Sequence, residues 1–213
     1  MKRFVRSVAL AASVLLLSAG VALAFPVDVG DTIYFDQTYG TTNGGQFDVS
    51  DSSDFLFSTF CLQRNEFLNL TDGFRVAGIS DQVVTGGVPG PYLAEATKWL
   101  YWNFSTGTLG GVGGYTYGTN LGANGLQRAI WYLQGEINST GDSVALALIG
   151  AAQDAVSASG FTGGDVKVIN LEWLDGRGAQ DLLVARPVPE PGALLLLGSG
   201  LLGLVYLRRR SKS

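Results

Sequence analysis

The chain has 213 residues, of which 46% are hydrophobic and 15% are charged, and its formal net charge is −4. It contains no histidine and a single cysteine, Cys61. These absences exclude a Ser-His-Asp or Cys-His nucleophile system, a histidine or multi-cysteine zinc site and an intramolecular disulfide. Carboxylate calcium sites stay possible. The protein is expected to be neither an enzyme nor dependent on a cofactor.

The first 24 residues are expected to be a signal peptide. Three basic residues within the first six positions precede an apolar stretch at residues 8–17, and small residues follow at Ala22 and Ala24. This order is typical of secretory signal peptides, with cleavage after Ala24. The alternative is an uncleaved membrane anchor, for which the apolar core is short.

Residues 25–187, called the exported body below, are long enough for one domain with a hydrophobic core. Between Phe25 and Arg186, seven Lys and Arg residues stand against 17 Asp and Glu residues, which leaves a net charge of −10. Such an acidic surface disfavours nucleic acid as a partner.

The first part of the exported body is expected to be β-structure. Short runs rich in aromatic and β-branched residues alternate with glycine-containing turns, a pattern typical of antiparallel strands. The expected strands are residues 32–35, 46–49, 55–62 and 74–79, and residues 85–91 are expected to be a loop.

The three aspartates at positions 48, 51 and 54 lie close together between two of these runs. They lack the spacing and the glycine of an EF-hand loop. We therefore interpret Asp48, Asp51 and Asp54 as solvated loop charges rather than as a calcium site.

The middle of the exported body changes to helical spacing. A helix is expected to begin at Pro91 and to run through Asn103, followed by a flexible glycine-rich connection. A second helix is expected at residues 126–136 with Asn124 as its cap, and a third at residues 142–157. Two further strands are expected at residues 166–173 and 181–186.

The order of strands, then helices, then strands predicts an α+β domain, which is a β-sandwich or barrel with an inserted helical subdomain.

Two segments of the exported body carry residues that could react with each other. Phe60-Cys61-Leu62-Gln63 ends an apolar strand, and Leu126-Gln127-Arg128-Ala129-Ile130-Trp131 opens a helix 66 positions later. With the intervening Lys98-Trp99-Leu100-Tyr101, these segments resemble the Cys-Gln thioester domains of bacterial surface adhesins. The resemblance spans about residues 55–136.

The resemblance implies that Cys61 and Gln127 form an internal thioester and that the domain attaches covalently to a target amine. Leu126 departs from the family, which usually has threonine before the glutamine. The chemistry needs no histidine or cofactor, because a cysteine thiol close to a carboxamide can expel ammonia and store the acyl group if water is excluded.

Other interpretations of the same residues stay open. Cys61 is also typical of a small buried hydrophobic residue or, if exposed, of an intermolecular disulfide. Glu136 and Asp142 could be the two carboxylic acids of a glycosidase, although their spacing in the sequence does not indicate that their carboxyl groups face each other. The aromatic residues could form a carbohydrate platform or pack in the core: Tyr92, Trp99, Tyr101, Trp102, Tyr115, Tyr117 and Trp173.

The C-terminal segment, residues 188–213, has three parts in order. Pro189-Glu190-Pro191 precedes an uncharged stretch at residues 192–207, and Arg208-Arg209-Arg210 follows. As a helix, the sixteen uncharged residues would measure about 24 Å, enough for a marginal transmembrane span. The arginines would remain cytoplasmic, which places the body on the outer side of the inner membrane.

This tail resembles the PEP-CTERM sorting signal of Gram-negative bacteria. The resemblance implies processing near the Pro-Glu-Pro motif by an exosortase, in cells that produce exopolysaccharide and biofilm. An ordinary tail anchor is the alternative.

The sequence thus predicts an exported envelope protein that is anchored in the inner membrane by its C-terminal helix or released to the cell surface or extracellular matrix. Its predicted role is adhesin-like binding to an amine-bearing surface ligand or exopolysaccharide through the Cys61–Gln127 thioester. The alternative is a passive structural component of the biofilm matrix. A glycan-processing enzyme ranks last.

Overall fold

The computed structural model describes residues 24–42, 44–66, 68–159, 161 and 165–186. Four predicted features lie outside these residues: the predicted signal peptide at residues 1–24 apart from Ala24, the Pro189-Glu190-Pro191 motif, the predicted transmembrane segment and Arg208-Arg209-Arg210. Within the described part, no helix has the length and apolar character needed to cross a membrane.

Six strands form one antiparallel sheet in the order β3-β2-β1-β4-β7-β8. Their bounds are Thr32–Thr42 for β1, Gly44–Ser50 for β2, Phe55–Thr59 for β3, Phe74–Ser80 for β4, Val166–Trp173 for β7 and Leu182–Ala185 for β8. Strands from both ends of the body therefore share one sheet, as expected. A separate hairpin joins β5, Gln82–Thr85, to β6, Val88–Tyr92.

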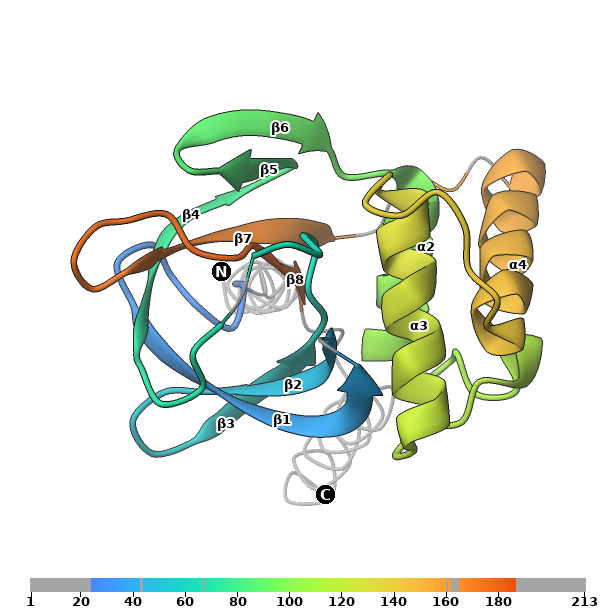
Figure 1. The fold of residues 1–213 in the computed structure, drawn as a ribbon, viewed down its shortest axis with the longest axis horizontal. Helices are drawn as coiled ribbons and strands as arrows, with labels where there is room; N and C mark the ends of the chain where they lie inside the picture. The colour runs from blue at the N-terminus through green and yellow to red at the C-terminus, as the bar shows by residue number, and fades with distance from the viewer. Residues whose placement is uncertain (1–23, 43, 67, 160, 162–164, 187–213) are drawn as a thin grey trace, which may run out of the picture.

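The sheet curls until its two edges almost meet, and Figure 1 shows the nearly closed barrel on the left of the molecule. The segment that follows β3 reaches β8 through an isolated bridge between Cys61 and Leu182. On either side of this bridge, the Leu183 N–H donates to the Phe60 carbonyl at 3.4 Å and the Leu62 N–H donates to the Asp181 carbonyl at 3.0 Å. Cys61 therefore lies at the seam where the barrel closes.

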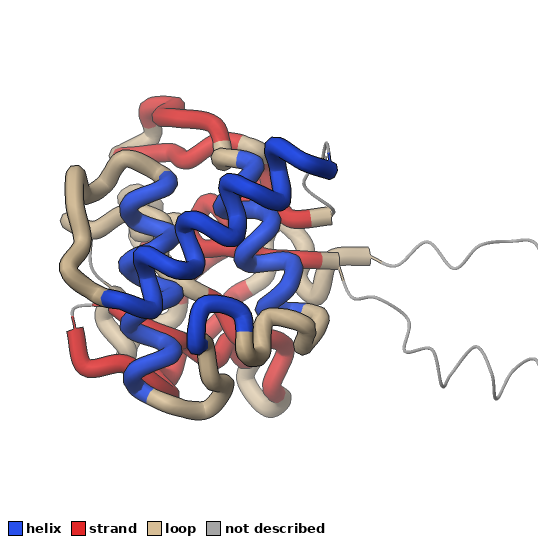
Figure 2. The backbone as a smooth tube through the Cα atoms, turned by 90° about the vertical axis from the view of Figure 1, so that its right-hand side faces the viewer, coloured by secondary structure: helices blue, strands red, loops and turns tan. Residues whose placement is uncertain are grey.

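Three helices are inserted between β6 and β7: α2, Glu95–Ser105; α3, Asn120–Leu133; and α4, Ser143–Ser159. A short 3₁₀ turn, Val112–Gly114, lies between α2 and α3. The helices pack together beside the barrel and form a layer in front of the strands in Figure 2. This arrangement agrees with the predicted α+β class and its inserted helical subdomain.

Two hydrophobic clusters fill the domain. One joins the three helices to the barrel wall and includes Leu100, Leu126 and Leu148. The other fills the barrel and includes Phe35, Phe74 and Cys61. Trp131 comes from α3 but belongs to the barrel cluster, so this helix face is packed directly against the interior where Cys61 lies.

Several predicted boundaries were wrong. The expected loop at residues 85–91 is mostly the turn and second strand of the β5–β6 hairpin, where Gly86 and Gly87 supply the positive φ angles of a tight turn. Helix α2 begins at Glu95 rather than at Pro91, which lies in β6. Strand β3 ends at Thr59, before Cys61.

The glycine-rich connection is also shorter than expected. Helix α3 begins at Asn120 and is capped by Thr119, whose hydroxyl accepts from the Gly122 N–H at 3.1 Å. Asn124, the expected cap, is inside the helix. The glycines within α3 are packing sites, because a side chain at Gly125 would overlap Val144 of α4.

Candidate functional site

Cys61 and Gln127, 66 positions apart in the sequence, lie together in the fold. The carboxamide of Gln127 projects from α3 onto the backbone of Cys61 at the barrel seam. Its Oε1 accepts a hydrogen bond from the Cys61 N–H at 3.0 Å, and its Nε2 donates to the Cys61 carbonyl at 2.7 Å. The two residues singled out by the sequence are therefore direct neighbours.

A second backbone donor reaches the same carboxamide oxygen. The Gly45 N–H, in β2, donates to Gln127 Oε1 at 3.3 Å. Two N–H groups on one carbonyl oxygen polarise the carbonyl. The neighbouring Gly44 permits this approach, because a Cβ at that position would lie only 3.0 Å from Gln127 Cγ and 2.6 Å from Trp131 Cη2.

Helix α3 holds the β1–β2 hairpin through a row of amide side chains. Asn120 Oδ1 accepts from the Gly40 N–H at 2.9 Å, and Asn124 Oδ1 accepts from the Thr41 N–H at 3.0 Å. With Gln127, these residues follow at intervals of four and three, which places them on one side of the helix. The row fixes the hairpin that carries Gly45 over the carboxamide. The sequence alone did not suggest that these three amides hold the hairpin, although their spacing of four and three residues is that of one helix face.

The junction between Cys61 and Gln127 is closed to solvent. The Cys61 side chain is 2% exposed and Gln127 is fully buried. Burial raises the pKa of the Cys61 thiol well above its ordinary value, while a contact with the Gln180 side chain opposes that shift weakly. The thiol is therefore protonated at neutral pH. Its burial also separates it from the exposed environment that an intermolecular disulfide requires.

A buried polar network fixes the chain that follows Cys61. Gln63 Oε1 accepts from the Asp181 N–H at 2.6 Å, and Gln180 Nε2 donates to the Gln63 carbonyl at 2.6 Å. The Asp181 carboxyl accepts from Asn170 Nδ2 at 2.9 Å and from the Leu171 N–H at 3.3 Å. Burial raises the pKa of Asp181 to about 7 despite these hydrogen bonds. The network links β7 and β8 to the seam.

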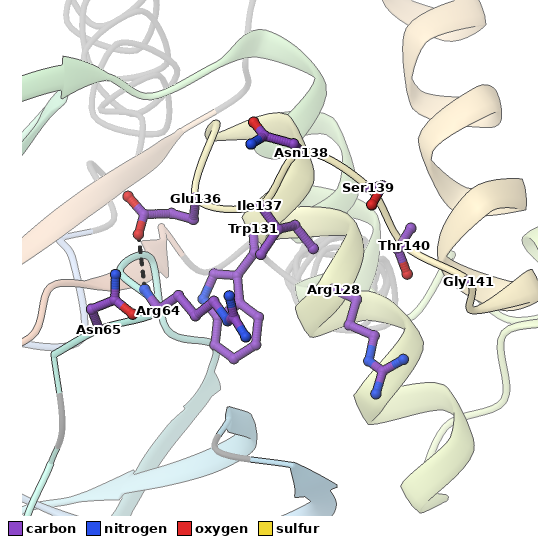
Figure 3. Close-up of a pocket in the computed structure, with 10 residues that line it drawn as sticks. All are labelled: Arg64, Asn65, Arg128, Trp131, Glu136, Ile137, Asn138, Ser139, Thr140 and Gly141. Atoms are coloured by element: carbon purple, nitrogen blue, oxygen red, sulfur yellow. Dashed lines mark hydrogen bonds between the residues drawn. The ribbon is translucent and has the colours of Figure 1, made fainter.

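An open cleft of about 860 Å³ lies beside the junction. Figure 3 shows Arg64 entering it from the segment after Cys61, and Arg128 and Trp131 entering it from α3. Glu136 lies on the same wall, where its Oε2 accepts from the Arg64 N–H at 2.9 Å. Because Trp131 also packs in the barrel cluster with Cys61, this side chain connects the cleft to the junction.

The remaining candidate residues do not come together as a second site. Tyr101 and Tyr115 are 1% and 2% exposed in the core, so they cannot offer their rings to a sugar. The ring of Trp173 packs against Phe74 with centroids 4.6 Å apart. The carbohydrate platform proposed from the whole aromatic set is therefore not formed.

The acidic residues considered earlier have structural partners. Asp142 Oδ1 accepts from the Ala145 N–H at 2.9 Å and caps α4, while Glu136 Oε2 accepts from the backbone N–H of Arg64 at 2.9 Å. Asp51 accepts from the N–H groups of Ser53 and Asp54, which lower the pKa of its carboxyl. Among the described residues, no three His, Cys, Asp or Glu side chains are grouped so as to hold a metal ion.

Comparison with known proteins gives information on the tail of the chain. No curated protein and no solved structure matches the sequence. Residues 187–210 match the PEP-CTERM protein-sorting motif, and the match includes Pro189-Glu190-Pro191 and Arg208-Arg209-Arg210. The chain therefore carries the sorting signal of an exported protein that an exosortase targets at the cell envelope or surface.

Proposed function

We propose that Cys61 and Gln127 form an internal thioester through which the exported protein attaches covalently to an amine on its partner. The observation that carries this proposal is the pair of N–H donors, from Cys61 and Gly45, on Gln127 Oε1. In the tetrahedral intermediate this oxygen carries negative charge, and in enzymes one such donor is worth roughly 100-fold or more in rate.

The forming step uses only groups at the junction. Cys61 Sγ attacks Gln127 Cδ, the bond from Cδ to Nε2 breaks, and the thiol proton leaves with that nitrogen as ammonia. The hydrogen bond from Nε2 to the Cys61 carbonyl holds the departing nitrogen against the cysteine backbone. The step balances without a co-reactant, because the proton lost by sulfur is the proton gained by nitrogen.

The second step transfers the acyl group. A partner amine attacks Gln127 Cδ, the bond from Cδ to Sγ breaks, and one proton of the amine returns to sulfur. The products are an amide between Gln127 and the partner and a free Cys61 thiol. Each molecule reacts once, which is the behaviour of an adhesin rather than of an enzyme. Burial of the junction favours survival of the thioester because it keeps water from the acyl carbon.

Methylamine labelling of the exported protein tests this proposal. Methylamine should add to Gln127 and release one thiol at Cys61, and the Cys61→Ala variant should take up none. Tryptic cleavage at Lys98 and Arg128 isolates Gln127 in peptide 99–128, while Gln134 falls in the next peptide and serves as an internal control. Equal labelling of Gln127 and Gln134, or labelling that persists without Cys61, would overturn the thioester.

A second candidate function is favoured by the same hydrogen bonds. The Gln127 carboxamide satisfies two backbone N–H groups and one carbonyl, so it could act only as a clasp that holds α3 to the barrel. The protein would then be a passive structural component of the extracellular or biofilm matrix. In that case methylamine leaves peptide 99–128 unchanged, while Gln127 is still needed for stability.

The tail supports a proposal for anchoring. The segment after Pro189-Glu190-Pro191 would hold the body on the periplasmic side of the inner membrane until an exosortase acts near the motif and releases the body to the cell surface. Replacing Arg208, Arg209 and Arg210 with alanine should disturb both topology and processing. Unchanged fractionation and unchanged mass of the mature protein would contradict this proposal.

A further inference from the structure

All but one of the basic side chains in the described residues form an ion pair. Seven Lys and Arg side chains are described, and six of them lie within 4.0 Å of a carboxylate: Arg75 with Glu172, Lys98 with Glu95 and Asp81, Arg128 with Asp142, Lys167 with Asp81, Arg177 with Asp175 and Arg186 with Asp165. The guanidinium of Arg64 has no carboxylate partner in the described part of the chain, and only the backbone N–H of this residue donates to Glu136. An unpaired guanidinium in a cleft can bind an anion from outside with two parallel hydrogen bonds.

A second arginine lines the same cleft beside Trp131. The Trp131 side chain is 4% exposed and its Nε1, itself buried, has no hydrogen-bond partner in the described structure, so the indole is a shielded wall of the cleft. Arg128 is 4.0 Å from Asp142, at the outer limit of an ion pair, and 37% of its side chain is exposed. Its guanidinium can therefore turn towards a ligand.

The rest of the lining determines the kind of anion. Asn65, Asn138, Ser139 and Thr140 provide amides and hydroxyls around the arginines, while Ile137 and the shielded Trp131 are the main apolar groups. Amides and hydroxyls match the hydroxyl groups of a sugar, and a guanidinium binds a carboxylate with two parallel hydrogen bonds. An acidic peptide could also pair with the arginines and, through its backbone, with part of this wall, so it is the competing ligand in the test below.

We propose that this cleft binds a uronic acid residue of an acidic glycan, with Arg64 and Arg128 on the carboxylate and the polar wall on the sugar hydroxyls. Glu136, whose Oε2 already accepts from the Arg64 N–H, has its other oxygen available to accept from a sugar hydroxyl. The proposal does not require the thioester. It adds a noncovalent recognition site beside the Cys61–Gln127 junction.

Calorimetric titration of the exported protein with oligogalacturonate tests the proposal, with the methyl-esterified oligomer as a matched uncharged ligand. The free acid should bind and the ester should bind at least about tenfold more weakly, because the charge-assisted contacts are lost. Arg64→Gln should weaken binding of the free acid by about tenfold or more. Arg177→Gln removes an equal charge from an exposed ion pair on another part of the domain and should leave binding unchanged.

Three results would overturn the uronate site. These are equal binding of acid and ester, an equal effect of the two arginine variants, and Arg64-dependent binding of a polyglutamate peptide without binding of oligogalacturonate. The Cys61→Ala variant separates this proposal from the thioester. It should bind oligogalacturonate like the unaltered protein even though it cannot take up methylamine.

Discussion

The Cys61–Gln127 junction and the neighbouring cleft are in contact through Trp131 but are built in opposite ways. At the junction, every polar atom of the Gln127 carboxamide faces a backbone partner and solvent is excluded. In the cleft, the exposed Arg64 guanidinium has no carboxylate partner among the described residues. A closed, satisfied junction suits storage of a bond, and an open, unsatisfied cleft suits recognition. Changes at the junction should therefore alter stability, and changes in the cleft should alter binding alone.

The largest effect on stability is expected for Gln127→Ala. This change leaves two backbone N–H groups and one carbonyl buried without partners, at about 1–3 kcal/mol for each group. We expect the free energy of unfolding to fall by about 3–9 kcal/mol in urea titrations. Gln153→Ala, at an exposed position on α4, is the control and should have almost no effect. If the two variants unfolded at the same urea concentration, the hydrogen bonds of Gln127 would not contribute to stability.

A pH-dependent effect is expected from Asp181. Its pKa in the fold is raised to about 7 from 3.8, so the folded state favours the protonated carboxyl. This contribution to stability is complete below about pH 4 and is lost as the pH rises through about 7, by up to about 4 kcal/mol. The Asp181→Asn variant should therefore show a shallower decline in unfolding free energy between these pH values than the unaltered protein.

The control for that measurement is Asp154→Asn, at an exposed position on α4. It should retain the full decline with pH. If Asp181→Asn and Asp154→Asn followed the same pH profile, the buried carboxyl would not be the source of the dependence.

Gly44→Ala should have a smaller effect on stability. The added methyl group would overlap Trp131 and press on Gln127, so the hairpin must move, at a cost of about 1–3 kcal/mol. The shift should also reduce methylamine labelling, because Gly45 would no longer hold Oε1. Gly141→Ala is the matched control, since its added methyl group would meet no atom within 4 Å. Equal melting temperatures for the two variants would show that the hairpin is not tightly held at this point.

The smallest effect on stability is expected for Arg64→Gln. Its guanidinium makes no ion pair in the described part of the chain, so the unfolding free energy should change by no more than about 0.5 kcal/mol. Thermal unfolding checks this expectation beside Arg177→Gln. A loss of several kcal/mol would mean that Arg64 supports the fold, and the contrast between cleft and junction would fail.

The sequence predicted the elements whose pattern is local. The alanine-rich run of α4 and the apolar strand β7 were correct to within two residues because helical composition and β-branched residues determine them directly. The start of α3 was wrong because Gly122 and Gly125 read as breakers. Their function depends on contact with Thr116 and Val144, which the local sequence does not contain.

In the candidate site, too, some residues could be predicted from the sequence and others could not. Cys61 and Gln127 could be named from the sequence because their residue types carry the chemistry. Gly45 could not be named, since its contribution is a backbone N–H whose position depends on two register shifts between β1 and β2. Arg64 could not be singled out either, because the absence of an ion pair is a property of the folded chain.

Peptide mapping of the untreated exported protein is the most direct test of the central claim. After digestion without added amine, the account predicts that the peptide containing Cys61 is joined to peptide 99–128, with a combined mass lower by one ammonia, and that no thiol reacts with an alkylating reagent. Two separate peptides at full mass, with Cys61 alkylated only after unfolding, would contradict the thioester and leave Gln127 as a structural clasp.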